Sequence, residues 1–354
     1  MTDSLHIAVI GAGLAGLSCA TALQAAGHRV QVFDKSRGPS GRLSTRRGEG
    51  WQCDHGAQYF TARDPGFRAE VARWEAAGVA APWLARLGVW PPGSAGVAGV
   101  VSEGEARGNL RPLESSDPRD PLAPGALQRF VGTPRMTAPA AWLAQGLTLH
   151  TEHTVQGLQR DGGAWRLLTA EHGLLADAFD TVLLAVPSPQ AGPLLGEHAP
   201  ALSALASGLR MRGSWALMLR FDATPAMPFD AAFVNQGPLR WVAHDGHKPG
   251  RGEAATWLLH ATAEWSEAHI EDPPETVAPL MLAAWAELGG PPPAAWTAHR
   301  WRYADTDPAC VPPETGCAWL PEQGLGLCGD WLHGGKVEGA WLSGQALAAQ
   351  VRGA

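Results

Sequence analysis

The first forty residues alternate between short apolar runs and a helical pattern. An apolar run rich in β-branched residues, 6–10, leads into apolar positions at helical spacing over 14–26, which end at Gly27. A second apolar run, 30–33, ends on Asp34. Apolar runs of strand length on both sides of a helical pattern are typical of a strand–helix–strand unit. We therefore predict such a unit over 6–34.

Beyond this unit, the pattern switches repeatedly between strand-like and helix-like stretches. Helices are predicted at 64–77, 138–145 and 274–288 and near the start of 202–222. Strands are predicted at 149–158, 164–170, 181–186, 231–242, 256–262 and 298–303. Between 87 and 124 the composition changes to Gly, Pro, Ser and charged residues with little periodicity, which predicts loops with at most a short hairpin. The mixture favours an α/β chain with two domains, a size that 354 residues allow.

Charge and cysteine content exclude several classes of protein. The formal net charge of −7 provides no basic surface, so we expect no nucleic-acid partner. The five cysteines include no C-x-x-C pair, which indicates neither a zinc site nor a disulfide framework. No run of about 20 apolar residues predicts a membrane span. We expect a reduced, cytoplasmic protein without a metal and without a membrane partner.

The turn after the first strand carries a dinucleotide-binding motif. Gly11, Gly13 and Gly16 form G-x-G-x-x-G, with Leu14 and Ala15 inside it. The first glycine permits a tight turn, the second lets the backbone approach a pyrophosphate, and the third lets the helix lie close to the strand. The helix then directs its unpaired N–H groups at the phosphates.

Two stretches after this turn have the composition of a ligand site. Asp34 lies where a carboxylate accepts hydrogen bonds from a ribose, and an acid there disfavours a 2′-phosphate. The glycine-rich segment 35–47 contains five basic residues, among which Lys35 and above all Arg42 are candidates to neutralise a second phosphate; the alternative is a solvated turn. A bend at Gly56 and Ala57 would let the backbone pass close to a ligand ring.

The end of the chain contains the second informative stretch. A strand ends on Gly329-Asp330, and after a glycine-rich loop a helix is predicted to begin near Glu338. Together with the first motif and with Gly41-Arg42, this arrangement resembles the glutathione-reductase-like flavoproteins, in the branch of the amine oxidases and desaturases. The resemblance implies an FAD-binding Rossmann domain with a second, mixed-sheet substrate domain. It also implies FAD bound between the two ends of the chain.

More narrowly, blocks in order along the chain resemble the bacterial renalase family. They are 34–37, 41–47, 56–64, 131–136, 257–262, 298–301 and 329–344. Two departures are Ser40, where the loop usually carries a second glycine, and the Gly/Pro-rich insertion 88–125. The resemblance implies a discontinuous FAD domain, 1–62, 149–200 and 303–354, and a substrate domain, 63–148 and 201–302.

The resemblance to this family implies a flavin oxidase that acts on unproductive dihydropyridine isomers of nicotinamide dinucleotides. Its substrates are 2- and 6-dihydro isomers of NAD(P)H. Their hydride passes to flavin N5, which gives NAD(P)+, and dioxygen becomes hydrogen peroxide. Hydride transfer of this kind depends on the placement of two flat rings more than on acid–base groups, and the sequence offers no evident strong base. We expect the FAD to be held without a covalent bond.

Several residues take roles from this resemblance. The helix near Glu338 would point its positive end, with the N–H groups of Gly339 and Ala340, at the pyrimidine edge of the flavin. Asp330 would bind the ribityl or phosphate region. The other assignments place Gln58 and Tyr59 near the reactive edge of the ring, Val155 at the adenine, and His260, Trp301, Tyr59 and His244 at the substrate. For His260, Val155 and Trp301 a role in core packing remains an alternative.

Three rival functions stay open at this point. One is an amine oxidase or desaturase on the same fold, which would commonly carry a lysine near the flavin. The three lysines, Lys35, Lys248 and Lys336, do not fall in a strand that resembles a site. The others are a Rossmann dehydrogenase, disfavoured by the Gly329-Asp330 motif, and a flavin-binding protein without turnover.

Overall fold

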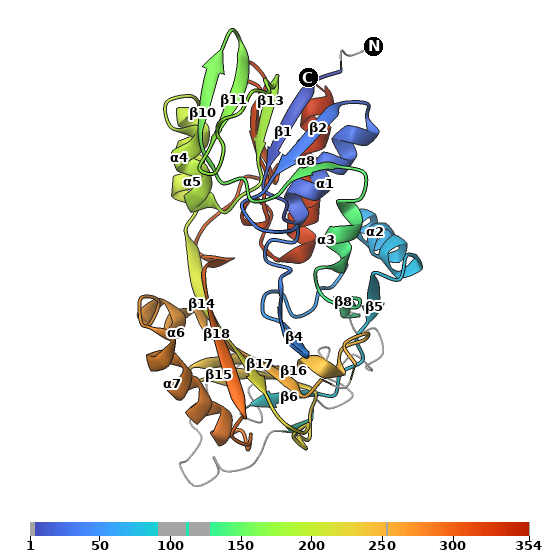
Figure 1. Cartoon of the computed structure of the whole chain (residues 1–354), viewed down its shortest axis with the longest axis vertical. Helices are drawn as coiled ribbons and strands as arrows, with labels where there is room; N and C mark the ends of the chain where they lie inside the picture. Colours follow the sequence, from blue (N-terminus) through green and yellow to red (C-terminus); the bar gives the residue numbers. More distant parts are fainter. Residues whose placement is uncertain (1–3, 91–110, 113–127, 253, 354) are drawn as a thin grey trace.

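The computed structural model describes residues 4–90, 111–112, 128–252 and 254–353. The chain forms two large sheets, one with six strands and one with seven, at opposite ends of an elongated molecule (Figure 1). The predicted insertion 88–125 lies mostly outside the described residues. Within the described part of the chain, no helix has the length and apolar character needed to cross a bilayer.

The six-stranded sheet contains the predicted strand–helix–strand unit. Its order is β19-β20-β13-β1-β2-β9, and every neighbouring pair is parallel except β19 with β20. The strands are β1 His6–Ile10, β2 Arg29–Phe33, β9 Thr148–His150, β13 Thr181–Leu184, β19 Ala318–Leu320 and β20 Leu325–Leu327. The central strand β1 is buried on both faces, which explains its continuous apolar run. The Rossmann-type sheet that the sequence predicts is confirmed.

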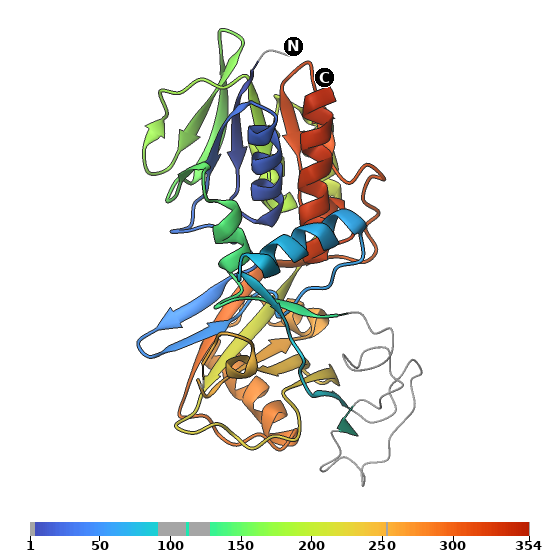
Figure 2. The same cartoon turned by 90° about the vertical axis from the view of Figure 1, so that its right-hand side faces the viewer.

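Helices from both ends of the chain cover one face of this sheet. α1 (Leu14–Ala25) packs against α8 (Lys336–Gly353), and Figure 2 shows the two side by side. A Cβ at Gly344 would collide with the backbone of α1 at Ala15, so a glycine is what permits this approach. α8 begins two residues before the predicted start at Glu338.

The seven-stranded sheet is mixed, as expected for the second domain. Its order is β18-β14-β17-β16-β15-β6-β7, antiparallel except for β15 with β6. The strands are β6 Leu87–Trp90, β7 Arg111–Pro112, β14 Met211–Arg220, β15 Ala231–Gln236, β16 Leu239–His244, β17 Thr256–Ala261 and β18 Ala295–Thr306. α7 (Pro274–Glu287) buries Val277, Met281 and Trp285 in the core on one face of this sheet, and α6 (Ala263–Ala268) packs on β14.

Shorter elements complete the two ends. A three-stranded sheet, β10 Val155–Asp161, β11 Ala164–Thr169 and β12 Gly173–Leu174, adjoins the Rossmann sheet together with α4 Ser188–Leu195 and α5 Pro200–Gly208. Two-stranded pairs are β3 Thr45–Gly48 with β4 Trp51–Asp54, and β5 Ala80–Pro82 with β8 Phe130–Gly132. The remaining helices are α2 Pro65–Ala76 and α3 Ala138–Leu143.

The packing bears on the predicted division into domains. α2 and α3, which the division assigns to the substrate domain, share one core cluster with α1 and β1. Conversely, Cys53 of β4, assigned to the FAD domain, packs on Ala216, Met218 and Leu258 of the seven-stranded sheet. The division into domains stays a prediction. In the structure, α2 and α3 pack at the Rossmann end of the molecule, and β4 packs at the end of the seven-stranded sheet.

Candidate active site

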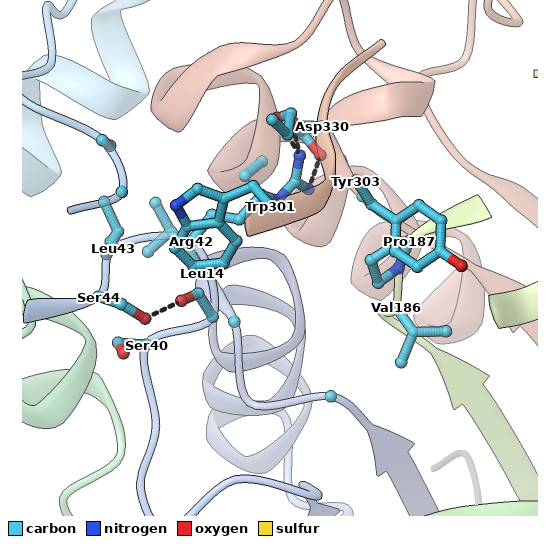
Figure 3. A pocket seen from close by; sticks show the side chains of 18 of the residues that line it. Leu14, Ser40, Arg42, Leu43, Ser44, Val186, Pro187, Trp301, Tyr303 and Asp330 are labelled. Atoms are coloured by element: carbon cyan, nitrogen blue, oxygen red, sulfur yellow. Dashed lines mark hydrogen bonds and ion pairs between the residues drawn. The ribbon is translucent and has the colours of Figure 1, made fainter. Parts of the chain in front are cut away.

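A cavity of about 1370 Å³ runs from the Rossmann sheet to the seven-stranded sheet. A pocket for a drug-sized ligand is at most about 1,000 Å³, so this cavity has room for a dinucleotide and a second ring. Its lining joins the first βαβ unit, the 40–44 loop, the 55–61 bend, β18 and the start of α8. Figure 3 shows part of this lining, including Trp301 and Tyr303 of β18 and Arg42 of the 40–44 loop. The structure therefore brings both predicted ligand motifs to one space.

The glycine-rich turn forms the phosphate end of the cavity. Gly11 has φ +108°, and a Cβ there would collide with the carbonyl of Ala185, so only glycine fits this turn. Gly13 is the N-cap of α1 and supplies no side-chain cap, which leaves the first-turn N–H groups available to an anion. Gly11, Gly13, Leu14 and Ala15 line the cavity, whereas Gly16 packs behind it against the Gly11 backbone.

Asp34 lines the cavity and also supports the glycine-rich turn. Its carboxylate accepts hydrogen bonds from the N–H of Ala12 at 2.6 Å and of Ser36 at 2.7 Å. Each carboxylate oxygen has a second lone pair, so a ribose hydroxyl can still be bound. Lys35 lies beside it in the lining, and Val155 lines the same end from β10.

Arg42 does not stand alone as a phosphate ligand. Its guanidinium donates two hydrogen bonds to the carboxylate of Asp330, one of them at 2.9 Å, and a third to the carbonyl of Ala304 at 3.1 Å. Figure 3 shows this ion pair between the 40–44 loop and the segment that follows β20. The two residues were predicted as separate ligands, and the structure joins them in one pair.

The bend at Gly56 is closely packed and supported from behind. A Cβ at Gly56 would collide with the Arg42 carbonyl, and the N–H of Ala57 donates to that same carbonyl at 2.9 Å. The Gln58 amide donates to the carbonyls of Asp54 at 2.6 Å and of Gly56 at 3.1 Å. These bonds hold the bend at the cavity wall, where Tyr59 follows it.

His260 and Trp301 converge on one backbone carbonyl of this bend. The His55 oxygen accepts from Nε1 of Trp301 at 2.8 Å and lies 3.0 Å from Nε2 of His260. A carbonyl can only accept, so Nε2 of His260 carries the hydrogen. Both side chains line the cavity, and the His55 ring stacks on Trp301 with centroids 5.3 Å apart. Two of the four residues predicted to contact the substrate are therefore neighbours.

The imidazoles of this wall are neutral at physiological pH. Burial lowers the pKa of His55 to about 3, with a further contribution from His299. Burial likewise lowers the pKa values of His260 and His299 to about 4. Such groups hold protons weakly and are poor general bases near neutral pH.

A cluster of four charged side chains lies behind the bend with no exposure to solvent. Nζ of Lys248 lies 3.3 Å from Asp54, 2.8 Å from Asp245 and 3.2 Å from Oε1 of Gln58. The Arg251 guanidinium binds Asp54 at 2.5 Å. Burial raises the pKa of the Asp54 carboxyl, but the charges of Lys248 and Arg251 outweigh it and lower the value to about 2. No lysine was expected in a strand that resembles a site; Lys35 and Lys336 line the cavity, and Lys248 donates to Gln58 of the cavity wall from behind.

The start of α8 forms another part of the cavity wall. Val337, Glu338 and Ala340 line the cavity, while Gly339 is absent from the described lining. The Glu338 carboxylate accepts from the N–H groups of Arg63 and Asp64 at 2.6 and 2.7 Å. Glu338 thus ties α8 to the segment before α2.

The prediction for His244 is not supported by its position. His244 is absent from the described cavity lining, and its ring stacks on Trp257 in the core on the other face of the sheet, 5.2 Å away. β16 contributes Arg240 and Trp241 to the lining, and His244, three residues after Trp241, points to the other face of the pleated strand. Asp245 is buried in the charged cluster.

The residues present fit FAD. An uncapped helix N-terminus beside Gly11, a carboxylate at Asp34 and an ion pair at Arg42 lie in order along one cavity. Neither Cys310 nor Cys317 belongs to the described lining, which offers no thiol from these positions for covalent attachment. The described residues also include no group of three or more His, Cys, Asp and Glu placed to hold a metal ion.

The comparisons with known proteins agree with this site. Residues 101–352 match the family of flavin-containing amine oxidoreductases, and 9–73 match NAD(P)-binding Rossmann-like domains. The chain belongs to the flavin-containing amine oxidoreductase family. FAD is the cofactor of this fold, and the chain is a flavin-dependent oxidoreductase.

Individual relatives resemble the chain either locally or in fold. An L-amino-acid oxidase of Daboia russelii is 47% identical over 53 residues, which are 14% of this chain and 10% of that relative. One from Siganus canaliculatus is 42% identical over 70 residues, 19% of this chain and 13% of its own length. The chain therefore spans only a small part of these relatives.

Solved structures match nearly the whole chain at low identity. A protein from Exiguobacterium sp. 255-15, provisionally named protoporphyrinogen oxidase, has a TM-score of 0.71 at 13% identity over 99% of both chains. Putrescine oxidase bound to putrescine has a TM-score of 0.65 at 14% identity, over 99% of this chain and 100% of its own. At such identities the likeness shows the fold.

Sequence reasoning missed several residues at the site. His55, His299 and Trp241 line the cavity, and the buried cluster around Lys248 supports it. His55 directly precedes the Gly56 bend, and His299 lies two residues before Trp301. Both histidines could therefore have been predicted at the site from their closeness in sequence to predicted site residues. The charged cluster gave no such signal, because Asp54 precedes Lys248 by 194 residues, although Asp245, Lys248 and Arg251 lie in one short segment.

Proposed function

We propose that this protein is an FAD-dependent oxidase of 2- and 6-dihydro isomers of NAD(P)H, as in the renalase family. The products are NAD(P)+ and, from dioxygen, hydrogen peroxide. When bound, the flavin supplies the acceptor for the hydride and returns the electrons to dioxygen. We also propose that the protein is cytoplasmic and holds FAD without a covalent bond; acid precipitation should then leave the yellow colour in the supernatant.

The observation that carries the proposal is the wall made by His55, His260 and Trp301. It places a flat indole and two neutral imidazoles beside the Gly56–Ala57 bend, anchored on one carbonyl. A wall of this kind can orient a flat ring. It is poorly suited to remove a proton, because imidazoles with pKa values of about 3 and 4 are weak bases.

A dihydropyridine donor suits such a site. It loses a hydride and becomes an aromatic cation, and no proton has to leave with the hydride. An amine donor must lose a proton as well, so its oxidation needs a site that holds or produces the neutral amine. The chain's own residues would therefore contribute position and exclusion of water.

Anaerobic stopped-flow spectroscopy tests this proposal. The 2- and 6-dihydro isomers should bleach the flavin absorbance rapidly and yield NAD(P)+, whereas ordinary NADH should react far more slowly. His260→Ala and Trp301→Ala should slow bleaching much more than they weaken FAD retention. Equal rates with common amines or with ordinary NADH would contradict the proposal.

An amine oxidase is the second candidate. Two observations favour it: the family to which the chain belongs, and Lys248, which binds Gln58 behind the cavity wall. Lys248 is fully enclosed between Asp54 and Asp245, and the charge of Asp245 helps to raise its pKa, although burial alone would lower it. A panel of amines, including L-amino acids and putrescine, in the same spectroscopic assay separates the two candidates.

A further inference from the structure

Arg46 and His299 make a contact that defines the chemical state of the histidine. Nη2 of Arg46, on β3, lies 3.1 Å from Nδ1 of His299, on β18. A guanidinium has only donors, so Nδ1 must be the acceptor. His299 is therefore a neutral imidazole whose hydrogen is on Nε2.

The His299 ring is held in place on two further sides. Its centroid lies 4.7 Å from that of His55 at an interplanar angle of 89°, and 4.5 Å from that of Trp301 at 73°. Edge-to-face contacts of this kind are favourable arrangements for flat rings. The ring is half-buried and lines the cavity. Its Nε2–H makes no hydrogen bond to any residue in the described ranges, so it can serve a ligand.

The charge behind this donor is not neutralised by a neighbouring acid. Among the residues that the structure describes, no carboxylate lies within 4 Å of the Arg46 guanidinium, whereas Arg42 has Asp330 and Arg240 has Asp305. A half-buried cation behind a neutral N–H donor favours an acceptor oxygen in front of it. The same arrangement disfavours an ammonium group.

We propose that His299 recognises the substrate by donating its Nε2–H to a carbonyl or carboxylate oxygen carried on the reacting ring. Arg46 is a positioning residue, which keeps the hydrogen on Nε2. Within the proposed function, on which this identification rests, the acceptor is the carboxamide oxygen of the dihydronicotinamide. The contact would hold the ring against Trp301 and reject aliphatic and benzylic amines.

Binding of simple ring ligands to the oxidised holoprotein tests the donor without turnover. Perturbation of the flavin spectrum reports the dissociation constants of benzamide and of benzylamine near pH 7.5. The wild-type protein should bind benzamide more tightly than benzylamine. His299→Ala should weaken benzamide binding about fivefold, the value of one hydrogen bond of average strength, and change benzylamine binding little. His299→Gln, which keeps an N–H donor, should recover part of the affinity.

Variants of Arg46 test the positioning role. Arg46→Met should weaken benzamide binding several-fold, because the imidazole can then exchange its hydrogen between the two nitrogens, and Arg46→Lys should restore it. In the His299→Ala background, Arg46→Met should have no further effect. An equal effect of Arg46→Met in both backgrounds would overturn the positioning role. Unchanged benzamide binding in His299→Ala, or tighter binding of benzylamine by the wild-type protein, would overturn the proposal itself.

Flavin reduction by the dihydronicotinamide isomers distinguishes this inference from the proposed function. If the isomers fail to reduce the wild-type protein while benzamide binding depends on His299, the proposed substrate is wrong and the donor role stands. If the isomers reduce His299→Ala with an unchanged dissociation constant and rate, the donor role is wrong and the proposed function stands. FAD content of each variant provides the control for folding.

Discussion

Arg42 and Asp330 are 288 positions apart in the sequence, yet they form a two-point ion pair inside the cavity. Arg42 comes from the loop after the first βαβ unit, and Asp330 follows the last strand of the Rossmann sheet. The pair joins the two motifs that the sequence identified separately. At the phosphate region a ligand therefore meets a guanidinium whose orientation is already set by a carboxylate.

Double-mutant analysis should detect this coupling. Arg42→Met and Asp330→Asn should each lower the free energy of unfolding of the holoprotein, because each leaves a partly buried partner unpaired. The double variant should lose less than the sum, with a coupling of about 1–2 kcal/mol, since both side chains are largely sheltered from water. Denaturant titration of the four proteins measures the coupling. Strict additivity would show that the pair contributes nothing.

Asp34→Ala should weaken FAD retention by about 1.5–3 kcal/mol, the value for hydrogen bonds to a charged group. The structure adds a second consequence, because the carboxylate also accepts from the N–H of Ala12 and holds the glycine-rich turn. Thermal stability of the FAD-free protein should therefore fall as well. Equilibrium dialysis and melting curves measure the two effects, and normal FAD binding would show that this end of the cavity does not hold the adenosine.

The neutral imidazoles predict that the protein loses stability in mild acid. The pKa values of His55, His260 and His299 are about 3, 4 and 4 in the folded chain, against about 6.5 when unfolded. Below pH 6.5 the unfolded chain binds more protons, so the free energy of unfolding falls toward pH 4, by up to about 1.4 kcal/mol per pH unit for each histidine.

One buried acid opposes this trend. Burial and the charge of Asp54 raise the pKa of Asp245 to about 6, so its contribution rises as pH falls from 6 toward 4. Unfolding titrations at a series of pH values should give a net decrease with acid. His299→Asn should flatten the slope, and Asp245→Asn should steepen it; a slope that neither substitution alters would contradict these assignments.

Lys248→Met should be strongly destabilising. The change leaves Asp54 and Asp245 enclosed with only Arg251 as a cation, and breaking a buried ion pair on one side costs about 3–5 kcal/mol. Adding Asp245→Asn removes the uncompensated charge and should recover much of the loss. Denaturant titration of both variants measures their free energies of unfolding. A Lys248→Met protein as stable as the wild type would contradict the charged state of the cluster.

The sequence predicted the parts of this molecule that are local. The glycines of 11–16, the acid at 34 and the alternation of strands and helices each have a short-range physical cause, and the structure contains the corresponding elements. The position of Trp301 and His260 at the cavity came from a resemblance to a family, and no periodicity in the chain could supply it.

What the sequence did not reveal depends on pairing between distant segments. His244 was expected at the substrate, but the register of β16 turns Trp241 toward the cavity and places His244 on the opposite face. Lys248, in the turn after β16, was given no role because it does not fall in a strand that resembles a site. Only the fold shows that this turn closes over Asp54 and Gln58.

The order of strands in the Rossmann sheet has a consequence for synthesis of the protein. β1 pairs with β13, which follows some 170 residues later, and β13 with β20, which is translated later still. During synthesis, the cofactor site can therefore form completely only after α8 has left the ribosome and packed on α1. Until then the first βαβ unit exposes an unpaired strand edge and an uncovered helix face. Such surfaces bind chaperones and also promote aggregation. FAD can bind the complete site only after that point, so FAD supplied once the chain has been synthesised should support the yield of active protein as well as FAD supplied during translation.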